Sequence, residues 1–345
     1  MKKFLLLTYL IVSGMYLGAQ IPEHYYDGTD ALRGQALKKA LYQIIKGQTE
    51  YPYTSSSTDV WDILKETDKD TLNPDNVILF YTGWSVNAAQ EYNNGRGWSR
   101  EHVWAKSRGD FGTDPPAGTD AHNLRPVDVS VNSARNNRWF DTCSVAYYDN
   151  GVATGCYTST TEWVWQPRKE VQGDVARIIF YMATRYEGEN GEPDLRVIDY
   201  LPADNSTNEP VHARLSTLLR WNELDPVDAF ERHRNDVIYS FQHNRNPYID
   251  HPEFVNKIWG PDSVATGIIV PEAHLIALYP NPASAKVYFR HAENLIKEVC
   301  SMEGRVLLRS TDKMMDIGQL PKGIYLVVFK DQHGKIVRRL KLVHS

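Results

Sequence analysis

Cysteine, long apolar runs and net positive charge are all scarce in this 345-residue chain. Its three cysteines allow no more than one internal disulfide. Beyond the first residues, no stretch is apolar over the ~20 positions that a membrane-spanning helix needs. No internal repeat and no low-complexity tract is present. The 42% of hydrophobic and 11% of aromatic residues are typical of a folded protein, and the length favours one large domain and one small one.

The charge of the chain is unevenly distributed. The formal net charge is −5, but residues 271–345 contain twelve Lys and Arg against seven Asp and Glu. Residues 20–270 therefore have a formal charge of −12. An acidic domain does not hold a polyanion by general electrostatic attraction, so any binding of one must depend on local groups.

The first 19 residues have the composition of a secretory signal peptide. Lys2 and Lys3 precede an apolar run that is short for a membrane span, and Ala19 is a small residue at which a signal peptidase can cut. An uncleaved membrane anchor is the alternative. We expect an exported protein without a membrane span, whose mature chain begins near Gln20.

Export places the chain in a compartment that permits disulfides. Cys143 and Cys156 flank a segment whose centre, Asp-Asn-Gly at residues 149–151, predicts a hairpin turn. We expect these two cysteines to form a disulfide that closes the hairpin. Cys300 is left over and is interpreted as a buried small hydrophobe.

The pattern of apolar residues predicts an α+β chain. Residues 32–47 and 173–188 have helical periodicity, and further helices are expected at 211–222, 226–241 and 252–259. From about residue 275, short alternating segments separated by turn residues predict a small all-β sandwich. The expected divisions are a signal peptide at 1–19, a main domain at 20–262, a linker at 263–274 and a sandwich domain at 275–345.

Two polar segments carry the candidate chemistry. The stretch "GRGWSREHVWAKSRGDFG" at residues 95–112 places Glu101 beside His102. An imidazole can act as a general base near neutral pH, and a carboxylate is a natural ligand of Mg²⁺. Downstream, "NSARNNRWF" predicts a short helix that places Asn132, Arg135 and Asn136 on one face. A base, a cation site and an arginine together meet the needs of phosphodiester hydrolysis.

Four ordered segments, "WSREHVWAKSRGDFG", "DAHNLRPVDVSVNSARNNRWFD", "GDVARIIFYMATRY" and "ERHRNDVIYSFQHNRNPYIDHPEFVNKIW", together resemble the bacterial endonuclease I family. Members of that family are secreted or periplasmic DNA and RNA nucleases with a ββα-metal active site. The resemblance covers residues 22–262 and implies that His102 is the general base and that Arg135 lies near the scissile phosphate. It implies Glu101 and Asn132 as ligands of Mg²⁺, for which Ca²⁺ or Mn²⁺ are alternatives. Ser99 and Ala105 depart from the Asn and Pro that are common there.

The tail, with "YPNPASAKVYF" and "LPKGIYLVVF", resembles the C-terminal sorting domain of the type IX secretion system. This similarity implies that the secretion machinery is a partner. It also implies delivery through the periplasm to the surface or surroundings of a Gram-negative bacterium. We expect a monomer.

Other residues near the motif have simpler interpretations. We expect His122 to hold its loop by hydrogen bonds, and it is the second candidate for the base. Asp120 and Asn123 are expected to organise the same loop. Two other functions stay open: an extracellular binding or adhesion protein on an inactive nuclease scaffold, and a phosphodiesterase that acts on small nucleotides.

Overall fold

The structure, a computed structural model, describes residues 21–260, 263 and 276–345, apart from 294, 303, 333 and 335. The expected signal peptide lies outside the described residues, as does the expected linker except for its first residue. The chain divides into two compact units, Met1–Ser263 and Val264–Ser345, which are described separately. In the described part of the chain, no helix is both long and apolar enough to cross a membrane.

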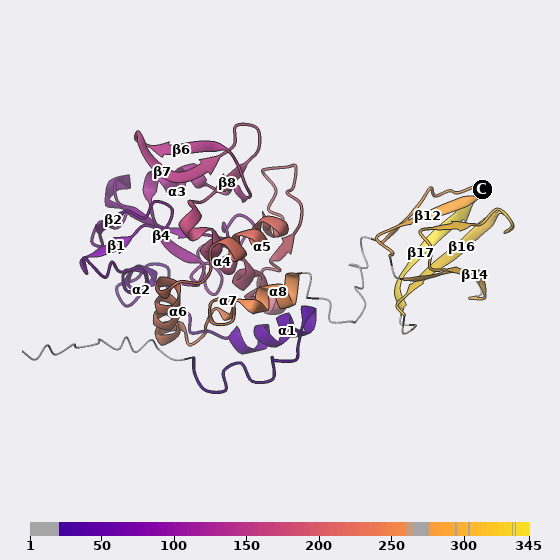
Figure 1. Cartoon of the computed structure of the whole chain (residues 1–345), viewed down its shortest axis with the longest axis horizontal. Helices are drawn as coiled ribbons and strands as arrows, with labels where there is room; N and C mark the ends of the chain where they lie inside the picture. The colour runs from indigo at the N-terminus through magenta and orange to yellow at the C-terminus, as the bar shows by residue number, and fades with distance from the viewer. Residues whose placement is uncertain are drawn as a thin grey trace, which may run out of the picture. The chain divides into compact units, whose positions relative to one another are not determined.

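The first unit is an α+β domain, as predicted (Figure 1). Its helices are α1 (Gly34–Ile45), α2 (Val60–Thr67), α3 (Val129–Arg135), α4 (Gln172–Arg185), α5 (Leu215–Leu224), α6 (Ala229–Gln242), α7 (Pro247–Asp250) and α8 (Glu253–Trp259). Its strands are β1 (Asn76–Ile78), β2 (Ser85–Asn87), β3 (Trp98–His102), β4 (Leu124–Asp128), β5 (Trp139–Phe140), β6 (Val145–Asp149), β7 (Val152–Thr158), β8 (Val164–Gln166), β9 (Arg196–Ile198) and β10 (Val211–Arg214).

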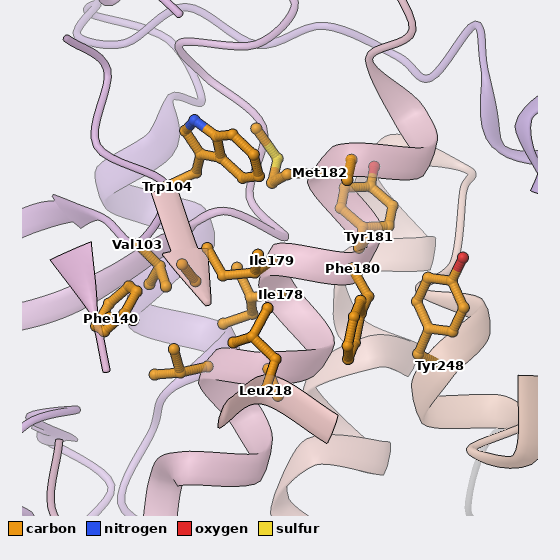
Figure 2. Packing of buried hydrophobic residues seen from close by; sticks show 14 of the residues in the cluster. Val103, Trp104, Phe140, Ile178, Ile179, Phe180, Tyr181, Met182, Leu218 and Tyr248 are labelled. Carbon is orange, nitrogen blue, oxygen red and sulfur yellow. The ribbon is translucent and has the colours of Figure 1, made fainter. Parts of the chain in front are cut away.

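Helix α4 is the centre of the core, and all of its residues are buried. The segment "IIFYMA" supplies apolar side chains to this core, and the buried Arg177 and Arg185 of the same helix are paired with Glu231 and Glu192. Figure 2 shows Ile178, Ile179 and Met182 of α4 in one cluster with Val103 and Trp104, the two residues that follow β3. The end of β3 is thereby anchored to the core of the domain.

Three sheets form in the first unit. The largest has the order β6-β7-β8-β5-β10-β9, so β6 and β9 are its two edges. The other two are the pairs β1-β2 and β3-β4. Only short strands are involved, and the helices contribute most of the core that holds the sheets in place.

Two helix predictions differ from the structure. The segment expected to be helical from residue 211 begins as β10, because Val211 and Ala213 are buried in the large sheet, and the helix starts only at Leu215. Helix α3 begins at Val129, earlier than predicted, since the Asp128 carboxylate accepts hydrogen bonds from the first backbone N–H groups. It ends at Arg135, and Asn136 has a φ of 53°.

The predicted disulfide is wrong in this structure, because Cys143 and Cys156 are both free thiols. The hairpin itself forms, with both turn residues, Asn150 and Gly151, at positive φ. Its register pairs Val145 with Thr158, so Cys156 is not the residue across from Cys143. Cys156 instead donates from Sγ to the carbonyl of Tyr81 at 3.2 Å.

The second unit is a β-sandwich, as predicted. One sheet has the order β11-β12-β15 and the other β14-β13-β16-β17. A single hydrophobic cluster joins them, with Val287 and Phe289 from the first sheet and Val299, Val327 and Leu342 from the second. The strands are β11 (Ala277–Tyr279), β12 (Lys286–Arg290), β13 (Ile296–Cys300), β14 (Val306–Ser310), β15 (Met314–Asp316), β16 (Gly323–Lys330) and β17 (Ile336–His344).

Candidate active site

The predicted site residues lie on one ββα unit made by β3, β4 and α3. Strands β3 and β4 are antiparallel, with Glu101 opposite Arg125 and His102 opposite Leu124. Helix α3 follows β4 without a loop. Gly97 precedes β3, and any side chain there would collide with the carbonyl of Gln90. The pairing of β3 with β4 brings β3 beside α3, although His102 and Asn132 are 30 residues apart in the sequence.

Glu101 and Asn132 face the same side of β3. Asn132 donates from Nδ2 to Ser99 Oγ at 2.9 Å, and Glu101 Oε1 lies 3.0 Å from Arg135 Nη1. Ser99 and Glu101 are two residues apart on the strand and so point to the same face. Asn132 and Arg135 are about one turn apart on α3. Helix α3 therefore packs its polar side on the face of β3 that carries Glu101.

Two oxygens on this face lack a protein donor. Glu101 Oε1 accepts a hydrogen bond from the Tyr81 hydroxyl at 2.9 Å and forms an ion pair with Arg135, but Oε2 has no hydrogen-bond partner among the described residues. Asn132 Oδ1 likewise has none in the described chain. Glu101 Oε2 and Asn132 Oδ1 are not fully buried, so solvent reaches both atoms. Burial raises the pKa of Glu101 to about 7, against the opposing effect of the Arg135 charge.

His102 points to the opposite face of β3. Its Nε2 lies 2.8 Å from the carbonyl oxygen of Gly118, which can only accept, so Nε2 carries the proton. Nδ1 then keeps its lone pair and has no partner in the part of the chain that the structure describes. The ring stacks on Tyr53 with centroids 5.7 Å apart. Burial lowers the pKa of His102 to about 4, so the imidazole is neutral at pH 7.

Arg135 is fully buried, which differs from the expected contact with phosphate. Nη1 donates to the carbonyls of His102 and Asn136 at 3.1 and 3.0 Å, and Nη2 donates to the carbonyl of Val103 and to His212 Nε2. The guanidinium therefore connects the end of β3 to α3 and balances the charge of Glu101. The N–H groups of Nη1 and Nη2 are directed at protein acceptors, whereas Nε has no partner among the described residues.

The loop that precedes β4 is held by hydrogen bonds, as expected for Asp120, His122 and Asn123. The Asp120 carboxylate accepts from the hydroxyls of Tyr181 and Tyr186 at 2.9 and 2.8 Å. His122 is buried with Nε2 at 3.3 Å from the carbonyl of Asn244, and burial lowers its pKa to about 4. Asn123 bonds both the N–H and the carbonyl of Trp104.

Sequence reasoning missed several residues of the site. Ser99 anchors Asn132, and the two-residue period of a strand was a signal that could have found it. Tyr81 and His212 come from distant segments, so no local pattern pointed to them. Lys106 is exposed, and its charge is one cause of the lowered pKa of His102, which places a cation near the imidazole.

The donor set fits a hard divalent cation. One carboxylate oxygen and one amide oxygen, both without protein donors, match the way in which Mg²⁺ is bound through one or two protein oxygens and several waters. Within the described ranges, no group of three or more His, Cys, Asp or Glu is placed to hold a metal. A cation held by these two oxygens would keep positions open for water and substrate oxygens.

The similarity of the chain to known protein families differs between its two units. Residues 33–253 match the family described as Endonuclease I, and residues 277–343 match the secretion system C-terminal sorting domain. The chain is 50% identical over 236 residues to the extracellular ribonuclease of Bacillus subtilis (strain 168). The matched segment covers 68% of this chain and 78% of that protein. It is 49% identical over 238 residues to the extracellular ribonuclease of Bacillus amyloliquefaciens, with 69% and 78% covered.

Proposed function

The chain belongs to the endonuclease I family, and from this premise we propose a metal-dependent endonuclease that cleaves RNA and DNA without strong sequence specificity. It is a secreted nuclease with a C-terminal sorting domain. The relatives named as extracellular ribonucleases support RNA as a substrate. We further propose that it acts as a monomer, outside a Gram-negative cell or on its surface, after passage through the periplasm.

The observation that carries the proposal is a set of three acceptor atoms on one ββα unit that have no hydrogen-bond partner among the described residues. They are Glu101 Oε2 and Asn132 Oδ1 on one face of β3, and His102 Nδ1 on the other. A hydrolase that cleaves phosphodiesters needs a base for water and oxygen ligands for a cation. Buried polar groups are generally hydrogen-bonded, so an acceptor atom that solvent reaches and that has no protein partner is a candidate for contact with water or substrate.

His102 is proposed to take the proton from the attacking water. The Gly118 carbonyl fixes the Nε2–H tautomer, and Nδ1 is then the only nitrogen that can accept. Tyr53 holds the ring plane by stacking. Because burial keeps the imidazole neutral, the base form is present at pH 7 without competition from protons.

Glu101 and Asn132 are proposed to hold the cation, with Mg²⁺ favoured and Ca²⁺ or Mn²⁺ as alternatives. A bound cation would stabilise the negative charge on the phosphoryl and leaving oxygens. Arg135 and Tyr81 orient the Glu101 carboxylate through Oε1 and leave Oε2 free. With an acidic domain around the site, exposed cations such as Lys106 are the candidates for contact with phosphate.

Nuclease activity on defined substrates tests the proposal. We expect the purified chain to shorten RNA and to nick plasmid DNA in Mg²⁺, and to lose both activities in EDTA. Excess Mg²⁺ should restore them, because the metal is bound reversibly by few protein ligands. Activity that persists in EDTA would contradict the metal requirement. A folded protein that cleaves neither polymer in any of the three cations would favour the inactive binding protein.

The anchoring of Asn132 by Ser99 leads to a second expectation. In Ser99→Ala the amide of Asn132 loses its partner, so the concentration of Mg²⁺ at half-maximal rate should rise several-fold. The rate at saturating Mg²⁺ should stay near that of the wild type. Titration of the rate with Mg²⁺ measures this, and Ser133→Ala, on the exposed side of the same helix, is the control. An unchanged Mg²⁺ requirement would show that Ser99 does not position the ligand.

A further inference from the structure

The hairpin of β6 and β7 exposes two tyrosines that the proposed chemistry does not use. Tyr148 is 58% exposed and Tyr157 is 37% exposed. Among the described residues, neither has a hydrogen bond from its hydroxyl or a contact with another aromatic ring. Their neighbour Tyr147 is different, because it packs on Trp165 with ring centroids 5.2 Å apart. Among the described residues, these two tyrosines therefore have no polar or aromatic partner.

The register places both rings on the outer face of the hairpin. Tyr157 is paired with Ala146, and Tyr148 is paired with Ala153. These residues are exposed, as is Gly155, whereas Thr154 and Cys156 of β7 are buried. The residues paired with the two tyrosines across the hairpin are alanines, whose side chains are small. We call Tyr148 and Tyr157 the tyrosine face.

This tyrosine face lies beside the helix that carries Asn132. At the hairpin turn, Asp149 Oδ1 accepts a hydrogen bond from Ser130 Oγ of α3 at 2.6 Å. Figure 1 shows β6 and β7 next to α3. Beyond the other end of α3, Arg138 donates from Nε to the carbonyl of Ala134, and its guanidinium lies 3.8 Å from the centre of the Trp163 ring. The hairpin turn and Arg138 thus lie at the two ends of α3, the helix that carries Asn132.

We propose that the tyrosine face, with Arg138, binds the unpaired bases and the backbone of a single-stranded nucleic acid next to the scissile phosphate. This inference rests on the proposed function. Tyrosine rings stack on bases of any sequence, but the base faces are accessible only when the strand is unpaired. The arginine supplies a local positive charge for a phosphate in a domain that is acidic as a whole.

A second copy of the chain is a poorer occupant of this surface. A stable protein interface buries about 800 Å² on each partner. Two tyrosine side chains bury at most roughly 500 Å² together when they are fully covered. The tyrosine face is thus large enough for one or two bases and too small, by itself, for a stable dimer.

Binding in EDTA tests the inference separately from catalysis. Fluorescence anisotropy of the full chain would be measured with a labelled single-stranded oligonucleotide and with a duplex of the same sequence. For the variant Tyr148→Ala/Tyr157→Ala, we expect the Kd for the single strand to rise about 5- to 100-fold, the loss that accompanies one or two stacked bases. The Kd for the duplex should change less than twofold. The double Phe variant should bind like the wild type, because it keeps both rings.

Tyr200→Ala is the matched control. Tyr200 is 54% exposed and follows β9, at the edge of the large sheet opposite to β6. It should leave both Kd values unchanged. An unchanged single-strand Kd in the double Ala variant would overturn the inference, as would an equal loss for duplex and single strand. A dimer in the wild type that the double Ala variant abolishes, measured by analytical ultracentrifugation, would assign the surface to a second copy instead. The two proposals fail in different measurements. A wrong proposed function shows as absent hydrolysis in Mg²⁺, whereas the binding measured in EDTA tests the tyrosine face alone.

Discussion

Replacing His102 by alanine is expected to lower kcat for RNA and DNA cleavage by about 10² to 10⁴, the usual contribution of a general base. The concentration of Mg²⁺ at half-maximal rate should stay close to that of the wild type, because Glu101 and Asn132 lie on the other face of β3 and keep their partners. Single-turnover rates at saturating Mg²⁺ would measure the effect on the chemical step. Added imidazole should restore part of the rate, since the missing group is a base.

His122 is the matched control for this experiment. Both histidines are buried, and burial lowers both pKa values to about 4. In His122→Gln, the amide can still donate to the carbonyl of Asn244, so the folded variant should keep a kcat within a few-fold of the wild type. If His102→Ala cleaves at the wild-type rate and His122→Gln does not, the base is His122, and the role given to His102 is wrong.

The second large effect is expected on stability, from Arg135→Ala. This substitution leaves the Glu101 carboxylate without its charged partner and three backbone carbonyls without a donor. Removal of one member of a buried ion pair costs about 3–5 kcal/mol of the free energy of unfolding. For a domain of this size, that corresponds to a fall in Tm of roughly 6 to 20 °C. Thermal unfolding followed by circular dichroism would measure it.

A double variant separates the structural role of Arg135 from contact with phosphate. Glu101→Gln in the Arg135→Ala background removes the unpaired carboxylate, so part of the lost stability should return while activity stays low. Arg138→Ala, which removes a half-buried arginine near α3, should change Tm far less. If Arg135→Ala keeps the wild-type Tm and only raises KM, the guanidinium binds substrate, as its position in the motif first suggested.

For Arg135 and Asn132, the sequence was sufficient to predict a shared helix face, but it did not predict burial. The three-residue spacing placed both on one face of a helix, and α3 confirms this. The spacing could not tell that Arg135 would be fully buried, because burial depends on β10, which brings His212 to the guanidinium from 77 residues away. Arg108 and Arg125 follow the same rule. Both are buried, Arg108 with protein carbonyls and Arg125 with Asp68 and Asp174, and these partners come from distant segments of the chain.

By itself, the sequence determined the α+β class, the β-sandwich, the hairpin turn at Asn150 and Gly151, and the adjacency of Glu101 and His102. Each of these depends on residues that are close together in the chain, where periodicity and turn chemistry act. Only the tertiary structure decided that Cys143 and Cys156 stay apart and that Ser99 and Tyr81 hold the two proposed ligands. It also decided that Nδ1 of His102 has no partner in the described part of the chain. Those outcomes depend on strand register and on contacts between distant segments, which local patterns do not contain.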